Sequence, residues 1–193
     1  CEDEPERGTQ RAIEAKHRDF IERQHVFFVA SAAAAARVNV SPKGLDALRV
    51  LGPKRVVYLD RTGSGNETAA HMLADGRLTI MFCAFEGPPL ILRLYGRGRV
   101  IRRGSEEYAR LLAMHFDGRE PVATRQMVSL DIDLVQTSCG YGVPNYEYGG
   151  ERPSLDNWAT AKGEAGIEAY WHEKNERSID GLPTGLFAEE PAE

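Results

Sequence analysis

The sequence predicts a mainly β fold, an antiparallel β-barrel with peripheral helices. Two observations support this prediction: strand patterns outnumber helical patterns along the chain, and the two kinds do not alternate regularly. Regular alternation would favour a doubly wound α/β fold, so the observed order favours an antiparallel barrel instead. The length of 193 residues is enough for one domain with a sizeable core.

Six strands are expected where β-branched, aromatic or alternating apolar residues lie between turns rich in Gly and Pro. They cover residues 26–31, 37–41, 55–60, 78–85, 90–101 and 126–135. The alanine run at 32–36 is interpreted as a hairpin connection. Pro42-Lys43-Gly44 should end the second strand, because proline cannot extend a hydrogen-bonded ladder.

The last two strands alternate between apolar and polar residues, which places one face on the core and the other toward water or a ligand. In the strand at 90–101 the apolar face carries Leu90, Leu92, Leu94 and Val100, and the other face carries Ile91, Arg93, Tyr95, Arg97 and Arg99. In the strand at 126–135 the residues predicted to point inward are Val128, Leu130, Ile132 and Leu134, with Asp131 and Asp133 outward.

Four helices are expected, over residues 9–24, 67–74, 105–115 and 155–174. Ser105 and Ser154 can cap the last two, and Gly163 and Gly166 should weaken the last one locally. The sequence after Asp180 is acidic and contains Gly and Pro, which predicts a flexible tail.

Residues 137–153 are predicted to form a long loop of Gly, Tyr, Pro and Asn without periodicity. Loops of that length in compact domains are usually functional or interfacial. Two interpretations of the aromatic residues in and after this loop stay open: Tyr141, Tyr146, Tyr148 and Trp158 wall a substrate site, or they pack against a dimer partner.

Composition and charge exclude several classes of protein. The net charge of −5 argues against general nucleic-acid binding, although it allows a local basic groove. Cys1, Cys83 and Cys139 form no CxxC pair and the five histidines form no HExxH motif, so neither a disulfide framework nor a metal site is expected. The longest apolar run, near 26–36, is too short to span a bilayer, and no signal peptide is visible. We expect a cytoplasmic protein that binds neither nucleic acid nor membrane.

Two polar clusters are candidates for binding a phosphate. The first, Arg61-Thr62-Gly63-Ser64-Gly65-Asn66-Glu67, lies between a predicted strand and a predicted helix. Glycines let backbone N–H groups converge there, the helix N-terminus adds partial positive charge, and the hydroxyl and amide side chains add donors. It is neither a Walker A loop nor a dinucleotide fingerprint. The alternative is an ordinary strand-to-helix turn with a Ser or Asn cap.

The second cluster is Arg37-Val38-Asn39-Val40-Ser41-Pro42-Lys43. Strand alternation puts Arg37, Asn39 and Ser41 on one face, and Lys43 lies just beyond them. Two cations and two hydrogen-bonding side chains within a short reach suit a phosphorylated ligand. The alternative is an exposed polar face.

These two clusters, together with Arg93-Leu94-Tyr95-Gly96-Arg97-Gly98 in a later strand, resemble the pyridoxamine 5′-phosphate oxidase-like family of FMN-binding split barrels. The resemblance runs from about His25 to Val135. It implies a six-stranded antiparallel split barrel of the FMN-binding type, a homodimer, and FMN in a cleft between the subunits. The chain would then comprise an N-terminal helix at 1–24, the FMN-binding barrel at 25–136, and a C-terminal loop, helix and tail at 137–193 that packs on the barrel or on the partner.

The resemblance also implies cofactor-binding roles. Near the flavin ring and ribityl chain it places Arg37, Val38, Asn39 and Val40; toward or around the phosphate it places Ser41, Lys43, Thr62, Gly63, Ser64, Gly65 and Asn66. Arg93 falls where the family has a polar side chain near the flavin ring, and a cation there would stabilise the reduced, anionic flavin.

The function implied is an FMN-dependent oxidoreductase acting on a small molecule, with NAD(P)H as a candidate electron donor and no catalytic acid or base assigned. The alternatives are a non-catalytic flavin-binding or sensing module, or a relative that uses deazaflavin F420 or haem. Oxidation of pyridoxamine phosphate itself is not expected. The family's B6 oxidase has Ser-Arg-Lys where this chain has Ser64-Gly65-Asn66, and its Arg- and His-bearing C-terminal segment has no match here.

Overall fold

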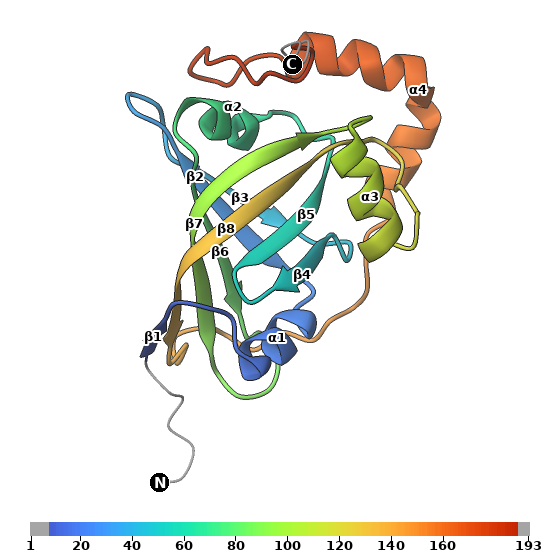
Figure 1. The fold of residues 1–193 in the computed structure, drawn as a ribbon. Helices are drawn as coiled ribbons and strands as arrows, with labels where there is room; N and C mark the ends of the chain where they lie inside the picture. Colours follow the sequence, from blue (N-terminus) through green and yellow to red (C-terminus); the bar gives the residue numbers. More distant parts are fainter. Residues whose placement is uncertain (1–7, 189–193) are drawn as a thin grey trace, which may run out of the picture.

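The computed structural model describes residues 8–188, which form an eight-stranded antiparallel sheet and four helices (Figure 1). The strands are β1 Gly8–Gln10, β2 Phe27–Ala32, β3 Asn39–Lys43, β4 Leu48–Gly52, β5 Arg55–Arg61, β6 Arg77–Cys83, β7 Ile91–Arg102 and β8 Thr124–Ser138. The helices are α1 Ala15–Glu22, α2 Glu67–Ala74, α3 Glu106–His115 and α4 Ser154–Lys174.

The strand order is β3-β2-β6-β7-β8-β5-β4, and β1 pairs with the far end of β8. Strands β3 and β4 are the two ends of this path and do not pair with each other, so the barrel is not closed. The mainly β fold with peripheral helices is confirmed, whereas the count of six strands is wrong. The two extra strands are β1, whose three residues are too short to show a periodic pattern, and β4, whose five residues do not alternate between apolar and polar side chains.

Several predicted boundaries also differ from the structure. The helix predicted at 9–24 is shorter, because its first residues form β1 and the helix begins only after Glu14, which caps it together with His17. The hairpin connection at 32–36 is confirmed, since β2 and β3 pair directly. Strand β3 nevertheless continues through Pro42 to Lys43. Proline is tolerated there because β3 is an edge strand, where one side of the backbone needs no partner.

The other three helices match their predicted ranges closely. Helix α2 has the predicted bounds, and the Ser105 hydroxyl caps α3 by accepting the Tyr108 N–H at 3.2 Å. Helix α4 bends at Gly163, whose φ of 67° is not helical (Figure 1). Gly163 is one of the two glycines predicted to weaken this helix; the other, Gly166, keeps helical geometry. None of the helices within residues 8–188 is long and apolar enough to cross a membrane.

The core lies between the long central strands β7 and β8 and their neighbours. Val128, Leu130 and Ile132 are buried, as predicted. Leu134 is only half-buried, and Val135 is fully buried in its place. The cause is a register shift: Tyr95 pairs with Leu134 but Gly96 pairs with Ile132, so one residue of β8 is skipped and the alternation changes phase.

The segment after α4 returns over α2 and packs on the loop at residues 62–66 (Figure 1). Thr184 is buried, and its hydroxyl donates to the Asn175 carbonyl at 2.7 Å. The prediction of a flexible tail after Asp180 is therefore wrong as far as residue 188, and residues 189–193 lie outside the described part of the chain. Composition misled here because the contacts that hold this segment come from distant residues.

We expect Gly96→Ala to destabilise the protein strongly. A Cβ atom at Gly96 would lie 1.9 Å from the Asp131 carbonyl oxygen, a backbone atom of the paired strand that cannot move away cheaply. The expected loss is about 3 kcal/mol, at the upper end for overpacking, measured by urea unfolding. Gly52→Ala is the matched strand control, because a Cβ there meets no atom within 4 Å. Equal stability of the two variants would contradict this account of the β7–β8 contact.

Candidate functional site

A cavity of about 680 Å³ lies where β3, the loop at 62–66, the start of α2 and the segment after α4 meet. Its lining includes Arg37, Val38, Asn39, Ser41 and Lys43 from the second sequence cluster, Gly63, Ser64, Gly65 and Glu67 from the first, and Asp60, Thr68, Arg125, Lys174, Arg177, Ser178 and Ile179. The structure therefore brings the two predicted clusters together in one site, although they are separate in the sequence.

This cavity carries positive charge in a protein of net charge −5. Five basic residues contribute to its lining, against the two carboxylates of Asp60 and Glu67. Both carboxylates are already engaged, Asp60 by two cations and Glu67 by the Ile179 backbone N–H at 3.0 Å. Arg37 is in turn paired with Asp180, which lies outside the lining. Basic residues still outnumber these three carboxylates, and this excess of positive charge would attract an anionic ligand such as a phosphate.

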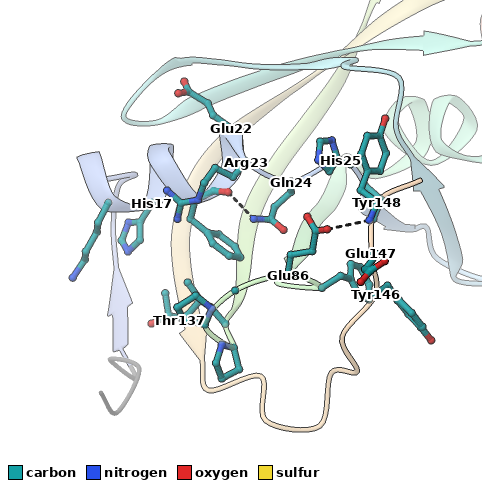
Figure 2. Close-up of a pocket in the computed structure, with 18 of the residues that line it drawn as sticks. His17, Glu22, Arg23, Gln24, His25, Glu86, Thr137, Tyr146, Glu147 and Tyr148 are labelled. Atoms are coloured by element: carbon teal, nitrogen blue, oxygen red, sulfur yellow. Dashed lines mark hydrogen bonds between the residues drawn. The ribbon is translucent and has the colours of Figure 1, made fainter. Parts of the chain in front are cut away.

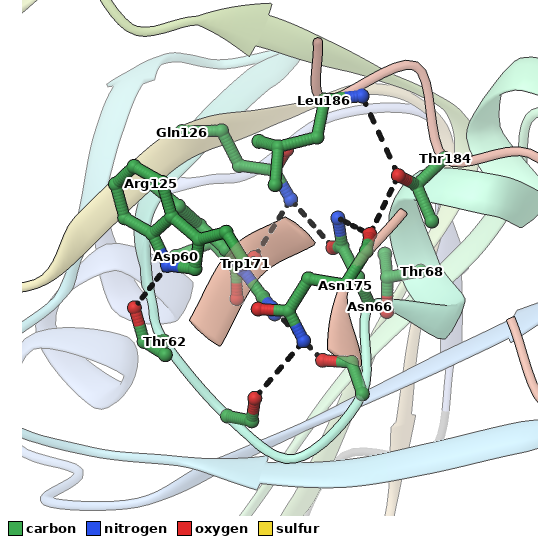
Figure 3. Close-up of polar contacts among 12 residues, drawn as sticks. Asp60, Thr62, Asn66, Thr68, Arg125, Gln126, Trp171, Asn175, Thr184 and Leu186 are labelled. Carbon is green, nitrogen blue, oxygen red and sulfur yellow. Dashed lines mark hydrogen bonds and ion pairs between the residues drawn. The ribbon is translucent and has the colours of Figure 1, made fainter. Parts of the chain in front are cut away.

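The buried carboxylate of Asp60 organises the floor of the cavity (Figure 3). It accepts hydrogen bonds from Lys43 Nζ at 2.8 Å, Arg125 Nε at 2.9 Å and Gln126 Nε2 at 2.8 Å. Burial alone would raise the pKa of Asp60, but the nearby charges of Arg125 and Lys43 and the hydrogen bonds outweigh it and hold this pKa well below its usual value. Asp60 therefore stays ionised at neutral pH and holds two cations beside the cavity.

Arg125 connects this carboxylate to the glycine loop. Its Nη1 donates to the Gly65 carbonyl at 2.9 Å and to Asn175 Oδ1 at 2.8 Å, and Asn175 Nδ2 in turn donates to the Gly63 carbonyl at 3.2 Å (Figure 3). Neither residue was predicted from the sequence. Arg125 is only 4% exposed, and its position directly before the predicted apolar strand at 126–135 is a signal that could have identified it, because charged residues are rarely buried without a partner. Nothing in the local sequence marks Asn175.

The loop residues divide into two groups. Gly63 and Ser64 are exposed and line the cavity with Gly65. Thr62 and Asn66 are buried and outside the lining. Thr62 Oγ1 donates to the Ala123 carbonyl and accepts the Trp171 indole N–H at 2.7 Å, and Asn66 Oδ1 accepts from Gln126 Nε2 at 2.8 Å. These two side chains therefore hold the shape of the loop.

Strand β3 presents the predicted polar face to the cavity. Asn39, Ser41 and Lys43 are half-buried on one face, while Val40 points away and is 62% exposed. Asn39 Nδ2 donates to Thr68 Oγ1 at 3.2 Å, which joins β3 to α2.

The structure does not bring Arg93 to this cavity. It lies on β7, paired with Met81 and Gln136, and its Nη1 donates to Ser138 Oγ at 3.2 Å. Its role near a flavin ring stays a prediction.

A second, larger cavity of about 960 Å³ lies between α1, the turn before β7 and the long loop after β8 (Figure 2). Tyr146 and Tyr148 line it, whereas Tyr141 and Trp158 do not. The Tyr148 ring stacks on His25 with centroids 3.6 Å apart, and its backbone N–H donates to Glu86 Oε1 at 3.0 Å. Part of the predicted aromatic wall therefore does face a cavity, but one that shares no residue with the basic cavity.

The fold and the cavity together define a mainly β protein with a basic cavity between an edge strand and a glycine loop. The sequence matches the family model described as pyridoxamine 5′-phosphate oxidase over residues 13–139. It is also 40% identical over 182 residues to the pyridoxamine 5′-phosphate oxidase family protein ustO of Aspergillus flavus, a match that covers 86% of this chain and 73% of the relative. The chain belongs to the pyridoxamine 5′-phosphate oxidase family.

Solved structures share this fold at low sequence identity. HupZ of Group A Streptococcus matches with a TM-score of 0.52 and 20% identity, covering 70% of this chain and 99% of HupZ. A Lactobacillus delbrueckii protein, provisionally assigned as a pyridoxamine 5′-phosphate oxidase, matches with a TM-score of 0.50 and 16% identity, covering 65% of this chain and 94% of its own. At these identities the comparison supports the fold alone.

We expect Asp60→Asn to destabilise the protein by about 3–5 kcal/mol at neutral pH, because Lys43 and Arg125 lose a buried counter-charge. Asp60 has a lowered pKa in the folded state, so its contribution is present above the unfolded pKa of about 3.9 and is lost as pH falls through the folded value. The wild type should therefore lose stability below pH 4 more steeply than the variant, measured by urea unfolding across pH.

Asp131→Asn is the control for this prediction, since Asp131 pairs with Arg55 at the surface, where both side chains are about half exposed. Exposed pairs are worth roughly 0–1 kcal/mol. An Asp60→Asn variant no less stable than Asp131→Asn would rule out a structural role for the buried network.

Proposed function

We propose that this protein is an FMN-dependent oxidoreductase that acts on a small molecule, and that it works as a homodimer with FMN at the subunit interface. One observation carries the proposal: in a chain of this family, the two clusters expected to hold the phosphate and the flavin side of FMN line a single cavity with an excess of basic residues. Its volume of about 680 Å³ lies within the usual range of small-molecule sites.

The residues present fit a phosphate group. Ser64 is exposed at the tip of the glycine loop, so its hydroxyl can donate to a phosphate oxygen, and Gly63 and Gly65 let the backbone approach closely. Lys43 reaches the same cavity from β3, and Arg37 reaches it from the residues just before that strand. The family resemblance places Arg37 near the flavin ring and ribityl chain, but it lines the same cavity as Lys43 and the glycine loop. We therefore propose that both cations neutralise the phosphate charge. Thr62 and Asn66 would act indirectly, by keeping the loop in this shape.

When bound, the flavin supplies the redox chemistry, and the chain supplies binding and orientation. Neither carboxylate of the cavity is placed as a proton carrier, because Asp60 is held ionised by Lys43 and Arg125 and Glu67 accepts the Ile179 N–H. The substrate and its electron donor, with NAD(P)H as the candidate, would therefore reach the flavin ring on the side away from the phosphate.

The exposed side of β3 supports the proposed homodimer. Val40 of the edge strand β3 is 62% exposed, and Val38, just before this strand, is 70% exposed. Exposed apolar residues on an unpaired strand edge are a liability that a partner surface removes. A second subunit would cover these valines, and a flavin ring beside Val38, which lines the cavity, would then lie between the two subunits. The cytoplasmic location expected from the sequence remains a prediction.

The alternatives differ in how well this cavity suits them. Among the residues that line it within the described part of the chain there is no histidine, which disfavours haem. A deazaflavin such as F420 also carries phosphate, and a non-catalytic flavin module would use the same cavity. The visible spectrum of the purified protein separates the cofactors, and stopped-flow reduction of bound flavin by NADH or NADPH separates an enzyme from a binding module.

We expect Ser64→Ala to weaken FMN binding by about 1.5–3 kcal/mol, the usual value of a hydrogen bond to a charged group, measured by quenching of flavin fluorescence. Riboflavin, which has no phosphate, should bind the variant and the wild type equally. Ser154→Ala, at an exposed serine outside the cavity, is the control.

A wild-type protein that neither carries nor binds FMN would contradict the proposed cofactor. Unchanged FMN affinity in Ser64→Ala would place the phosphate elsewhere. A monomer in sedimentation equilibrium with FMN bound would overturn the interface part of the proposal.

A further inference from the structure

We propose that Asp180 determines the affinity and selectivity of this cavity for phosphorylated ligands, because its carboxylate occupies Arg37 and competes with the ligand's phosphate for it. This inference rests on the proposed function, in which Arg37 is a phosphate ligand. It adds a residue from the segment after α4 that neither sequence cluster contains.

Asp180 binds Arg37 at two points. Its Oδ2 accepts the Arg37 backbone N–H at 2.7 Å, and its Oδ1 pairs with the Arg37 guanidinium. A backbone N–H and a guanidinium are also the donors that a phosphate uses in proteins. The Asp180 carboxylate thus satisfies the donors of Arg37 as the oxygens of an anionic ligand would.

The exposure of the two side chains is unequal. The Asp180 side chain is only 12% exposed, whereas that of Arg37 is 74% exposed. A ligand phosphate can therefore reach the guanidinium from solvent, but it then lies near the negative charge of Asp180, which contacts the guanidinium from outside the cavity lining. Either the ligand displaces Asp180, or it binds beside a like charge. Both routes cost binding free energy that a neutral side chain at position 180 would not require.

The turn that carries Asp180 is held by other contacts. The Ser178 N–H donates to the Leu182 carbonyl at 2.9 Å, and the Gly181 N–H donates to the Ser178 carbonyl at 2.9 Å. The Ile179 N–H donates to both Glu67 oxygens at 3.0 Å. Removing the charge of Asp180 should therefore leave the turn in place. Removing this charge therefore distinguishes two roles. If Asp180 competes with the ligand, the loss of its charge should strengthen ligand binding; if Asp180 only holds the segment in place, the loss should open the cavity and weaken binding.

The test compares wild type, Asp180→Asn and Asp131→Asn with three probes: FMN, riboflavin and inorganic phosphate. Asparagine keeps an oxygen that can accept the Arg37 N–H but removes the charge. Asp131→Asn removes a charge from a surface pair with Arg55, outside the cavity, and controls for net charge. Affinities are measured by flavin fluorescence and by isothermal titration calorimetry.

We expect Asp180→Asn to bind FMN about tenfold more tightly than wild type, the scale of one like-charge contact at a partly exposed site. Riboflavin affinity should not change, and Asp131→Asn should behave as wild type. In an Arg37→Ala background, Asp180→Asn should bring no further gain, because Asp180 acts through Arg37. Weaker or equal FMN binding by Asp180→Asn, or an equal gain for riboflavin, would overturn the inference.

The inorganic phosphate arm separates this inference from the proposed cofactor. If neither flavin binds any variant, the proposed function fails, and Asp180 is then judged on inorganic phosphate alone. Tighter phosphate binding by Asp180→Asn would retain the competition, and unchanged or undetectable phosphate binding in every variant would reject it. If FMN binds wild type but Asp180→Asn brings no gain, the cofactor stands and the role of Asp180 is rejected.

Discussion

The buried ion pairs of Asp60 are the interaction on which the rest of the site depends. One carboxylate, 1% exposed, is bound by Lys43 from the edge strand β3 and by Arg125 from the central strand β8. Two charges taken out of water are stable only when they are paired and hydrogen-bonded. The network therefore ties the edge of the sheet to its centre and directs both cations toward one cavity. Arg125 extends the same network to the glycine loop through the Gly65 carbonyl.

The sequence was sufficient for the parts of the protein that depend on local pattern. Helix α2, the hairpin between β2 and β3 and the polar face of β3 follow from caps, turns and alternation, which act within a few residues. The bulge that changes the phase of β8 depends on how β7 pairs with it, and no local pattern encodes that. Short strands such as β1 exist only because a partner strand accepts them.

The candidate site shows the same division. Both phosphate-type clusters were visible in the sequence, because phosphate binding needs glycines and cations close together. Their meeting in one cavity was expected from the family resemblance and not from either cluster alone. The floor made by Arg125 and the wall made by the segment after α4 were not visible, since they depend on contacts between residues 50 or more positions apart. For that segment the composition led to a wrong prediction: its Gly and Pro content predicted a flexible tail, whereas in the structure Asn175 and Thr184 are buried.

Asn175 is fully buried, and it donates to Gly63 and accepts from Arg125. During synthesis Gly63 leaves the ribosome long before Asn175, so the glycine loop at first lacks the side chain that donates a hydrogen bond to its Gly63 carbonyl. The hydrogen bonds that complete this part of the structure can therefore form only after residues 175–184 have been synthesised. The cavity is a late product of chain elongation, and a chain that ends within α4 would have all eight described strands but an incomplete cavity.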